Sequence, residues 1–475
     1  MSGPLLAAGR LHPLAAVLYA AKVVRNAVPL LVTGLVTDIP RPALYAVVAA
    51  VLVIGVPYGV LAWWRFRYRV EAGRLVVDTG VLVRRNRVVP LERIRGISLD
   101  EPLTHRLFGL VRARVEAAAA GDQKGELSLA AVGRAQAERL RDAVVHGGDE
   151  AAPAEVPPPM AAMRPSRLAL AGATSARFVL VPAAAAGGLL NFADDIGLDG
   201  LLRSGAGQVA DRAPHGAVSI SLAVTTAAVV VVLLAAAGSV IADWAFELRA
   251  DGRRLTTVRG LLSRRRTTVD RRRLLGVEVC DSPVRRALGM AAVVAPVGGF
   301  GVSDDGDTAG RVRLLPLGDA DEVARVRAEI APGDAPGLQP HPRAGLPRRL
   351  VRAAGLPAAA SAAAALMGWW WVAGLAALAA AAMVPVAFDR HRNLGHAIGG
   401  RLVIRSGSLS RRHSFIDPGA VVATTVRSTP FQRRRGLGSV RVHLGLGAGS
   451  RTATDLGADQ GAAMLARLYP WMREG

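Results

Sequence analysis

Residues Arg74 to Ile97 read RLVVDTGVLVRRNRVVPLERIRGI, and the chain repeats this stretch twice more. The second copy, Arg254 to Val277, is RLTTVRGLLSRRRTTVDRRRLLGV, and the third, Arg401 to Val422, is RLVIRSGSLSRRHSFIDPGAVV. In each copy a glycine is followed 29 residues later by another, at Gly80 and Gly109, Gly260 and Gly289, and Gly407 and Gly436. Three copies in the same order with constant spacing indicate an internal repeat.

The repeated stretch has the pattern of β-strands. Short runs rich in Val, Ile and Leu alternate with Arg or Thr, and Gly, Asp or Pro interrupt them. An amphipathic helix is expected at the end of each copy, as in Arg134 to Val145, where Ala137, Leu140 and Val144 share one face. Each copy therefore predicts a small barrel or sandwich closed by one C-terminal helix.

Composition places the chain among membrane proteins. Its 475 residues are 51% hydrophobic with a mean hydropathy of +0.31, yet the formal net charge is +22. Apolar spans that alternate with basic cytoplasmic segments produce both values at once. Nucleic-acid binding is disfavoured, because apolar spans separate the basic stretches and aromatic residues are only 4%. The single cysteine, Cys280, excludes an intrachain disulfide and a thiolate metal site.

Apolar stretches predict six membrane helices, with the last stretch long enough for two. A crossing helix needs about 20 apolar residues for a bilayer core of about 30 Å. Arg65, Arg67 and Arg69 follow one stretch directly and predict that its end is cytoplasmic. The stretches are Leu11–Val36, Ala43–Trp64, Arg164–Leu190, Val218–Trp244 and Ala353–Phe388.

The predicted fold class is an integral membrane α + β protein with six transmembrane helices in three hairpins. Each hairpin is followed by a cytoplasmic β-barrel or sandwich with a C-terminal helix as its cap. The expected hairpins are residues 11–64, 164–245 (with an outer loop at 193–217) and 348–388. The expected β domains are residues 65–146, 246–331 and 389–475, and the expected linkers are 147–163 and 332–347.

Particular motifs carry a family resemblance. Gly80 followed by two apolar residues and an arginine pair, with Pro102 and Leu107-Phe108-Gly109 further on, resembles the membrane-flanked bacterial pleckstrin-homology-like (PH-like) domains, bPH2. Three such domains behind paired spans resemble the YdbT-like members of that family. Copy two has Ala287-Leu288-Gly289 in place of Leu-Phe-Gly, and copy three, with Arg434 to Gly438, diverges most. The resemblance implies a bent two-sheet barrel closed by a C-terminal helix, and no catalytic residues.

Arginine clusters occupy equivalent positions in the three copies. The planar guanidinium suits bidentate contact with phosphate, and a basic residue near an anionic surface contributes about 1 kcal/mol. The alternative is that these arginines only set the membrane topology from solvated strand faces. The predicted binding residues for anionic lipid or a protein partner are Arg84, Arg85, Arg87, Arg264, Arg265, Arg266, Arg411 and Arg412.

The function predicted from these features is a non-enzymatic scaffold or binding module at the cytoplasmic face of the plasma membrane. Its expected partners are the bilayer, anionic lipids or a membrane protein, without nucleic acid, metal or cofactor, and the family suggests a role in envelope homeostasis. The protein is expected to be multi-pass with both termini cytoplasmic. The alternative is a transporter or lipid-handling protein, with Lys22, Arg25 and Arg177 along a path among six helices.

Overall fold

The computed structural model of the chain describes two compact units, Met1–Val269 and Asp270–Gly475. The predicted outer loop at 193–217 lies outside the described residues except for its last residue, and Lys22, Arg25 and Arg177 lie outside them too. The described residues are 5–17, 23, 29, 41–81, 83–91, 94–117, 126–146, 158–175, 217–298, 310–333, 337–445 and 448–469.

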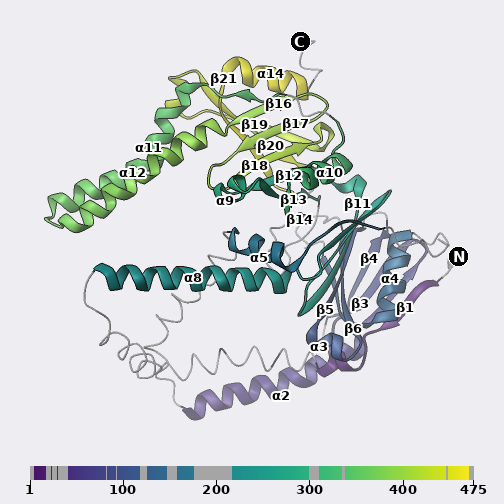
Figure 1. Cartoon of the computed structure of the whole chain (residues 1–475). Helices are drawn as coiled ribbons and strands as arrows, with labels where there is room; N and C mark the ends of the chain where they lie inside the picture. The colour runs from purple at the N-terminus through teal and green to yellow at the C-terminus, as the bar shows by residue number, and fades with distance from the viewer. Residues whose placement is uncertain are drawn as a thin grey trace. The chain divides into compact units, whose positions relative to one another are not determined.

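The N-terminal unit contains two antiparallel sheets (Figure 1). A four-stranded sheet has the order β1-β2-β3-β4, and a seven-stranded sheet has the order β7-β6-β5-β11-β10-β9-β8. The strands are β1 Leu5–Arg10, β2 Arg67–Glu71, β3 Arg74–Thr79, β4 Arg85–Pro90, β5 Ile94–Pro102, β6 Leu110–Ala117, β7 Glu126–Gly133, β8 Pro159–Ala162, β9 Glu247–Asp251, β10 Arg254–Arg259 and β11 Ser263–Asp270. The helices are α2 Arg41–Arg65, α3 Leu103–Leu107, α4 Arg134–His146, α5 Pro165–Ala173 and α8 Ala217–Ala242.

One hydrophobic core joins the four-stranded sheet to β5–β7. Alternate residues of β2, Tyr68 and Val70, point inward with Leu75 of β3, as the period of two in a strand requires. From α4, Leu140 is fully buried in the same core. The first copy thus forms two packed sheets closed by its C-terminal helix.

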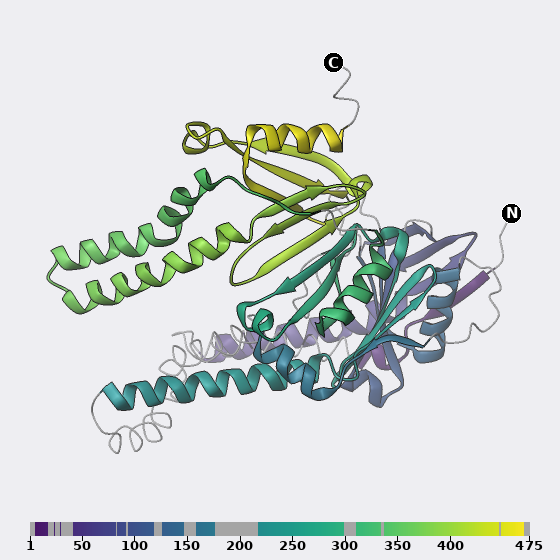
Figure 2. The same ribbon diagram turned by 45° about the horizontal axis from the view of Figure 1, so that its top comes forward.

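The C-terminal unit has the same organisation. Its sheets have the orders β14-β13-β12-β18-β17-β16-β15 and β19-β20-β21. Its strands are β12 Gly276–Asp281, β13 Met290–Pro296, β14 Arg311–Asp319, β15 Gln339–Pro340, β16 Gly395–Ile398, β17 Leu402–Ser406, β18 Arg411–Ile416, β19 Val421–Arg427, β20 Leu437–Leu444 and β21 Ser450–Gly457. Its helices are η2 Arg271–Arg273, α9 Pro283–Ala287, α10 Ala320–Ile330, η3 Arg343–Gly345, α11 Leu346–Leu366, α12 Trp370–Arg392, η4 Pro418–Ala420, α13 Pro430–Arg433 and α14 Ala458–Leu468. Helix α14 lies over β20 and β21 (Figure 2), and its Met464 is buried in their core.

Strands of neighbouring copies join into continuous sheets, which the prediction of separate barrels did not anticipate. Strand β11 of copy two pairs with β5 of copy one, with Arg265 opposite Asp100. Strand β18 of copy three pairs with β12 of copy two, with Arg411 opposite Asp281. We call these two pairings the seams. Each seven-stranded sheet is therefore built from two copies.

The first glycine of each copy has a steric reason. Gly80, Gly260 and Gly407 adopt φ values of +98°, +105° and +98°. A Cβ at Gly407 would lie 2.0 Å from the carbonyl oxygen of Ser410, and the other two positions meet the same obstacle. Only glycine fits this turn without strain.

The prediction of six membrane helices is wrong. Within the described residues, two helices are long and apolar enough to cross a membrane, Pro42–Arg65 and Trp370–Arg392. Helix α5 has nine residues, and within α8 the unbroken stretch whose side chains are described, Val229–Ala242, is shorter than a span. Helix α11 is alanine-rich and has three arginines in its first turns, so its hydropathy is too low. Most of the predicted stretches Leu11–Val36 and Arg164–Leu190 lie outside the described residues.

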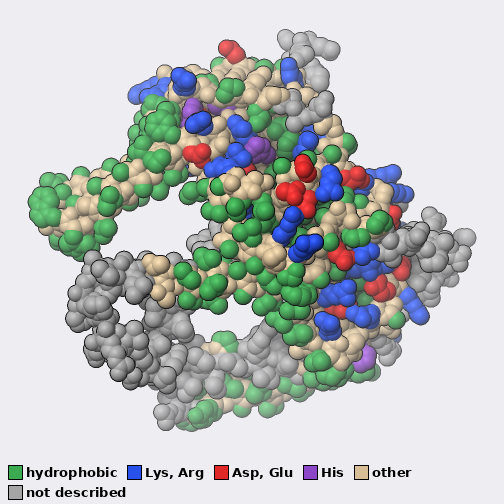
Figure 3. Space-filling view, in the orientation of Figure 1, with side chains coloured by type: hydrophobic (Ala, Val, Ile, Leu, Met, Phe, Trp, Pro, Cys, Tyr) green, Lys and Arg blue, Asp and Glu red, His purple; other side chains and the backbone are tan. Residues whose placement is uncertain are grey.

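Helices α11 and α12 form an antiparallel hairpin that leaves the β-sheets of its unit (Figure 2). Large apolar side chains along the hairpin are exposed, including Leu356, which is 81% exposed, and Leu378, which is 68% exposed. Figure 3 shows the outer part of the hairpin covered by hydrophobic side chains without charge. Because soluble proteins rarely expose such a surface, this element is suited to a lipid environment.

Candidate functional site

The first predicted arginine cluster lies at β4. Arg84 directly precedes the strand, Arg85 begins it, and both are exposed, whereas Arg87 is half-buried. Strand β4 is the last strand of its sheet in the described part of the chain. These side chains are therefore placed where a ligand or partner can reach them.

The other two clusters lie at the seams. Arg265 Nε donates to Asp100 Oδ1 at 2.7 Å, and Arg411 Nη2 lies 2.8 Å from Asp281 Oδ2. The remaining contacts are longer, with Arg266 3.5 Å from Glu138 and Arg412 3.6 Å from Glu278. Arg264 is exposed and lies opposite Glu101. These arginines hold neighbouring copies together, and whether any of them binds lipid or a partner stays a prediction.

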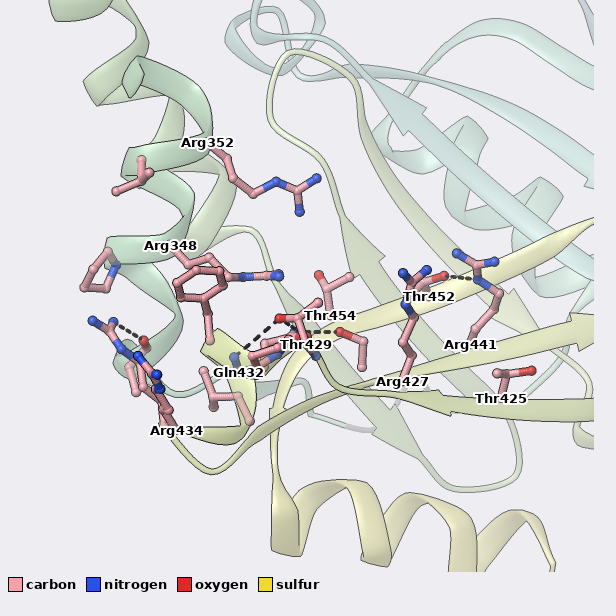
Figure 4. Close-up of a pocket in the computed structure, with 18 residues that line it drawn as sticks. Arg348, Arg352, Thr425, Arg427, Thr429, Gln432, Arg434, Arg441, Thr452 and Thr454 are labelled. Carbon is pink, nitrogen blue, oxygen red and sulfur yellow. Dashed lines mark hydrogen bonds between the residues drawn. The ribbon is translucent and has the colours of Figure 1, made fainter. Parts of the chain in front are cut away.

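A cavity of about 1040 Å³ in the C-terminal unit is a site that the sequence analysis did not expect. Its walls come from the start of α11, from β19–β21 and from the segment around α13. Figure 4 shows Arg348 and Arg352 reaching in from α11, and Arg427 and Arg441 from β19 and β20. The basic lining residues are Arg348, Arg352, Arg427, Arg434, Arg435 and Arg441, and none of the lining residues is acidic.

Local capping shapes one wall of this cavity. Thr429 and Gln432 form a capping box at the start of α13, and Pro430 occupies the first turn. Gln432 Nε2 then donates to Asp455 Oδ1 at 2.8 Å and to Ser439 Oγ at 2.9 Å. The short helix is thus tied to the sheet behind it.

Asp455 ties α11 to the same sheet. This fully buried carboxylate accepts contacts from Arg348 Nη2 and Arg349 Nη2, both at 2.7 Å. Its backbone is left-handed, with φ +61°, beside a register irregularity in the β20–β21 pairing. Because an unpaired buried charge is costly, the two arginines fix the base of α11 at the cavity wall.

Within the described residues, five of the six cavity arginines are not neutralised in this way. In the described part of the chain, no carboxylate forms an ion pair with Arg352, Arg427 or Arg434. Of the others, Arg435 Nη1 donates to the carbonyl oxygen of Ala344 at 2.9 Å, and Arg441 Nε lies 3.4 Å from Thr452 Oγ1. The cavity therefore carries a surplus of positive charge.

Apolar side chains share the cavity with these cations. Val351 of α11 is 70% exposed and Phe431 of α13 is 71% exposed, and Leu437 also belongs to the lining. Guanidinium groups bind phosphate through paired N–H donors, and the apolar residues fit a hydrocarbon chain. The arrangement suits an anionic amphiphile better than a fully polar anion.

Two buried histidines lie behind the cavity wall. His341 Nδ1 is 2.7 Å from the carbonyl oxygen of Thr454, which can only accept, so this nitrogen carries the proton. His341 Nε2 then accepts from His396 Nδ1 at 3.2 Å. Burial lowers the pKa of His341 to about 4 and also lowers the pKa of His396. The pair is neutral at pH 7 and is held by its own hydrogen bonds, as a structural pair would be.

Sequence reasoning missed this cavity for a physical reason. In the sequence, Arg348 and Arg352 only precede an apolar run, and Arg434 and Arg435 only mark the divergence of the third copy. The residues are separated by as much as about a hundred positions in the chain, and only the β20–β21 sheet brings them together. The divergence at Arg434 was the available signal.

Comparison with known families identifies the repeat. The family described as the bacterial PH domain matches residues 16–146, 205–331 and 351–469, which together make up more than half of the chain. This chain belongs to the bacterial PH domain family. The three matched segments coincide with the three copies of the repeat, which confirms the resemblance noted in the sequence.

A curated relative extends this assignment to the membrane. Over 142 residues the chain is 29% identical to UPF0699 transmembrane protein YdbT of Bacillus subtilis (strain 168). The match covers 28% of this chain and 29% of that protein, so it spans less than a third of the relative's length. No solved structure was found to match the chain. Together with the two apolar helices, these findings support a membrane-associated bacterial PH-domain protein.

In the described part of the chain, no group of three or more His, Cys, Asp or Glu residues is placed to hold a metal ion. His391 and His396, which the sequence places five residues apart, are not joined by a third ligand there.

Proposed function

We propose that this bacterial PH-domain protein is a membrane-anchored, non-enzymatic binding protein that holds the phosphate-bearing headgroup of an anionic lipid in its C-terminal unit. One observation carries the proposal, the cavity with six arginines and no acidic lining residue at the start of α11. Helix α11 belongs to the bare apolar hairpin, so the cavity lies next to the element best suited to lipid.

The energetics favour binding at a membrane surface. Each basic residue near an anionic leaflet contributes about 1 kcal/mol, and in the described part of the chain Arg348 is the one cavity arginine that pairs with a carboxylate. Val351 and Phe431 supply apolar contacts for the acyl region of the same molecule. A lipid can therefore contact both the arginines and the apolar side chains of the lining, whereas free phosphate can contact the arginines alone.

The proposal includes the orientation of the protein, with its β-sheets on the cytoplasmic side. Arg65 ends α2 and Arg67 follows it, while Arg390 and Arg392 end α12. Positive charge at the ends of membrane helices is typical of the cytoplasmic face. A role in envelope homeostasis would follow from sensing the anionic lipid of that leaflet.

The test is a titration of the full-length protein in detergent micelles with a fluorescent short-chain phosphatidylglycerol. Arg427→Glu combined with Arg434→Glu should weaken binding by more than about tenfold, because each reversal removes one attraction and adds one repulsion. Arg401→Glu is the matched control, since Arg401 belongs to the same unit and does not line the cavity. It should change the affinity less than about twofold.

Two further arms identify the ligand class. Phosphatidylcholine of the same chain length should bind much more weakly, and inorganic phosphate should compete only at high concentration. Equal affinity for the two lipids, or an unchanged affinity of the double variant, would refute the proposal. Complete competition by low inorganic phosphate would assign the cavity to a free anion instead.

A further inference from the structure

The two seams are built with one register. Arg265 and Arg412 each lie five residues after the turn glycine of their own copy, Gly260 and Gly407. Their partners, Asp100 and Cys280, each lie twenty residues after the turn glycine of the preceding copy. The first half of each copy thus offers an edge strand that pairs with the second half of the copy before it.

Strand β4 is the same edge in the first copy. Among the described residues, β4 pairs only with β3. Val88 of β4 is 47% exposed, whereas Thr268 and Phe415 at the equivalent seam positions are 7% and 8% exposed. Strands β11 and β18 each pair along this edge with a strand of the preceding copy. Among the described residues, the same edge of β4 has no partner strand.

The charges on this edge match those of the occupied edges. Arg84 and Arg85 correspond to Arg264 and Arg265 and to Arg411 and Arg412. Across the first seam this pair faces the adjacent carboxylates of Glu101 and Asp100. Across the second seam Arg411 faces Asp281, which is 7% exposed. Each occupied edge joins arginine to acid, and in β4 the acid is absent from the described residues.

A second copy of this chain does not supply that acid. In the third copy, the strand that corresponds to β5 and β12 is β19, which lies at the edge of its sheet. Its sequence is VVATTVR, which contains no acidic residue. Counted from Gly407, Arg427 and Ser428 take the places of Asp100 and Glu101. Pairing β19 with β4 would put Arg427 opposite Arg85, and like charges directly opposite are destabilising.

We propose that β4 is a docking edge for an extended acidic segment of a different protein, which adds to the sheet as an antiparallel strand. The segment has two adjacent carboxylates in the register of Asp100 and Glu101, so that they face Arg85 and Arg84. Main-chain hydrogen bonds provide the affinity and the carboxylates the register, as in other cases of strand addition. This site lies in the N-terminal unit and is independent of the lipid cavity.

The probe is a fluorescent peptide with the sequence of β5 itself, Ile94–Pro102 (IRGISLDEP). It is titrated against the full-length protein in detergent and compared with the same peptide carrying Asp100→Lys and Glu101→Lys. The native peptide should bind at least about tenfold more tightly than the reversed one. Because the change is made in the peptide, this comparison does not depend on the folding of a protein variant.

The complementary experiment reverses the charges on β4 of the protein and titrates the same two peptides. With Arg84→Glu and Arg85→Glu the preference should invert, so that the lysine peptide binds more tightly. The cavity variant with Arg427→Glu and Arg434→Glu should leave peptide binding unchanged, and the β4 variant should leave lipid binding unchanged. Failure of one site is thereby distinguished from failure of the other.

Two outcomes would overturn the proposal. Equal or absent binding of the two peptides would show that β4 does not select acidic strands. Sedimentation showing a dimer of the full-length protein that Arg84→Glu and Arg85→Glu alter would show that β4 binds a second copy instead.

Discussion

At the scale of single residues, buried carboxylates determine where many of the arginines lie. Asp100, Glu278, Asp281 and Asp455 are each at most 7% exposed, and each contacts at least two arginines. A buried charge is tolerated only when it is paired and hydrogen-bonded. Part of the +22 net charge is therefore structural, which the sequence pattern alone did not reveal.

The buried histidine pair predicts acid sensitivity of the C-terminal unit. The pKa of His341 is lowered to about 4, mainly by burial and to a smaller extent by His396 and Arg349, while the hydrogen bond to the Thr454 carbonyl and the Asp455 carboxylate act in the opposite direction. An unfolded histidine titrates near 6.5. Between these values the unfolded chain binds a proton that the folded chain does not, so stability decreases as the pH falls from about 6.5 to about 4.

Chemical denaturation of the full-length protein at pH 7 and pH 5 measures this effect. The expected loss at pH 5 is on the order of 1–2 kcal/mol for His341. His341→Gln should reduce the difference between the two pH values, since glutamine does not titrate. Equal or greater stability of the wild-type protein at pH 5 would contradict the assignment.

At the scale of elements, strand and helix types follow from local pattern, but their partners do not. The repeated glycine turns and alternating apolar residues predict β-strands in each copy, and the structure has them. The pairing of β11 with β5 depends on edges separated by more than 150 residues. Residues of the two predicted linkers form the edge strands β8 and β15. Strand β8 pairs with β9, which follows α5 and α8, and strand β15 pairs with β16, which follows α11 and α12.

A substitution of Asp455 tests whether this carboxylate holds α11 to the β20–β21 sheet. Asp455→Asn keeps the size of the side chain and suits the left-handed backbone, but it leaves Arg348 and Arg349 without their counter-charge. Breaking a buried ion pair costs about 3 kcal/mol or more. Denaturation of the full-length protein should show this loss in the C-terminal unit.

The matched control is Asp459→Asn on α14, where the carboxylate is exposed. It should change stability by less than about 0.5–1 kcal/mol, as an exposed residue near a helix start does. Equal effects of the two substitutions would mean that Asp455 does not anchor α11.

At the scale of the whole molecule, two units carry three family segments. The boundary at Val269 falls inside the second segment, residues 205–331, because its first half pairs with copy one and its second half with copy three. The membrane helices belong to both units, α2 to the first and α12 to the second. Both units are thus equipped to be held at a bilayer.

Cysteine labelling measures the proposed orientation. In a Cys280→Ser background, Asp459→Cys on α14 should react with a membrane-impermeant maleimide only after the membrane is opened. In intact spheroplasts Asp459→Cys should stay unlabelled, because α14 packs on the β-sheets that the proposal places on the cytoplasmic side. Labelling in intact spheroplasts would place the sheets on the outer side.

The amino-acid sequence by itself determined the threefold repeat, the β character of each copy, the turn glycines and the family, because these depend on residues close together in the chain. The interpretation of the apolar stretches predicted too many membrane helices, since the bounds of α11 include three arginines that lower its mean hydropathy. Only the tertiary structure decided the seams, the arginine-lined cavity and the open edge of β4. Each of these arises where distant strands meet, and the local pattern of a strand does not specify which edge it will find.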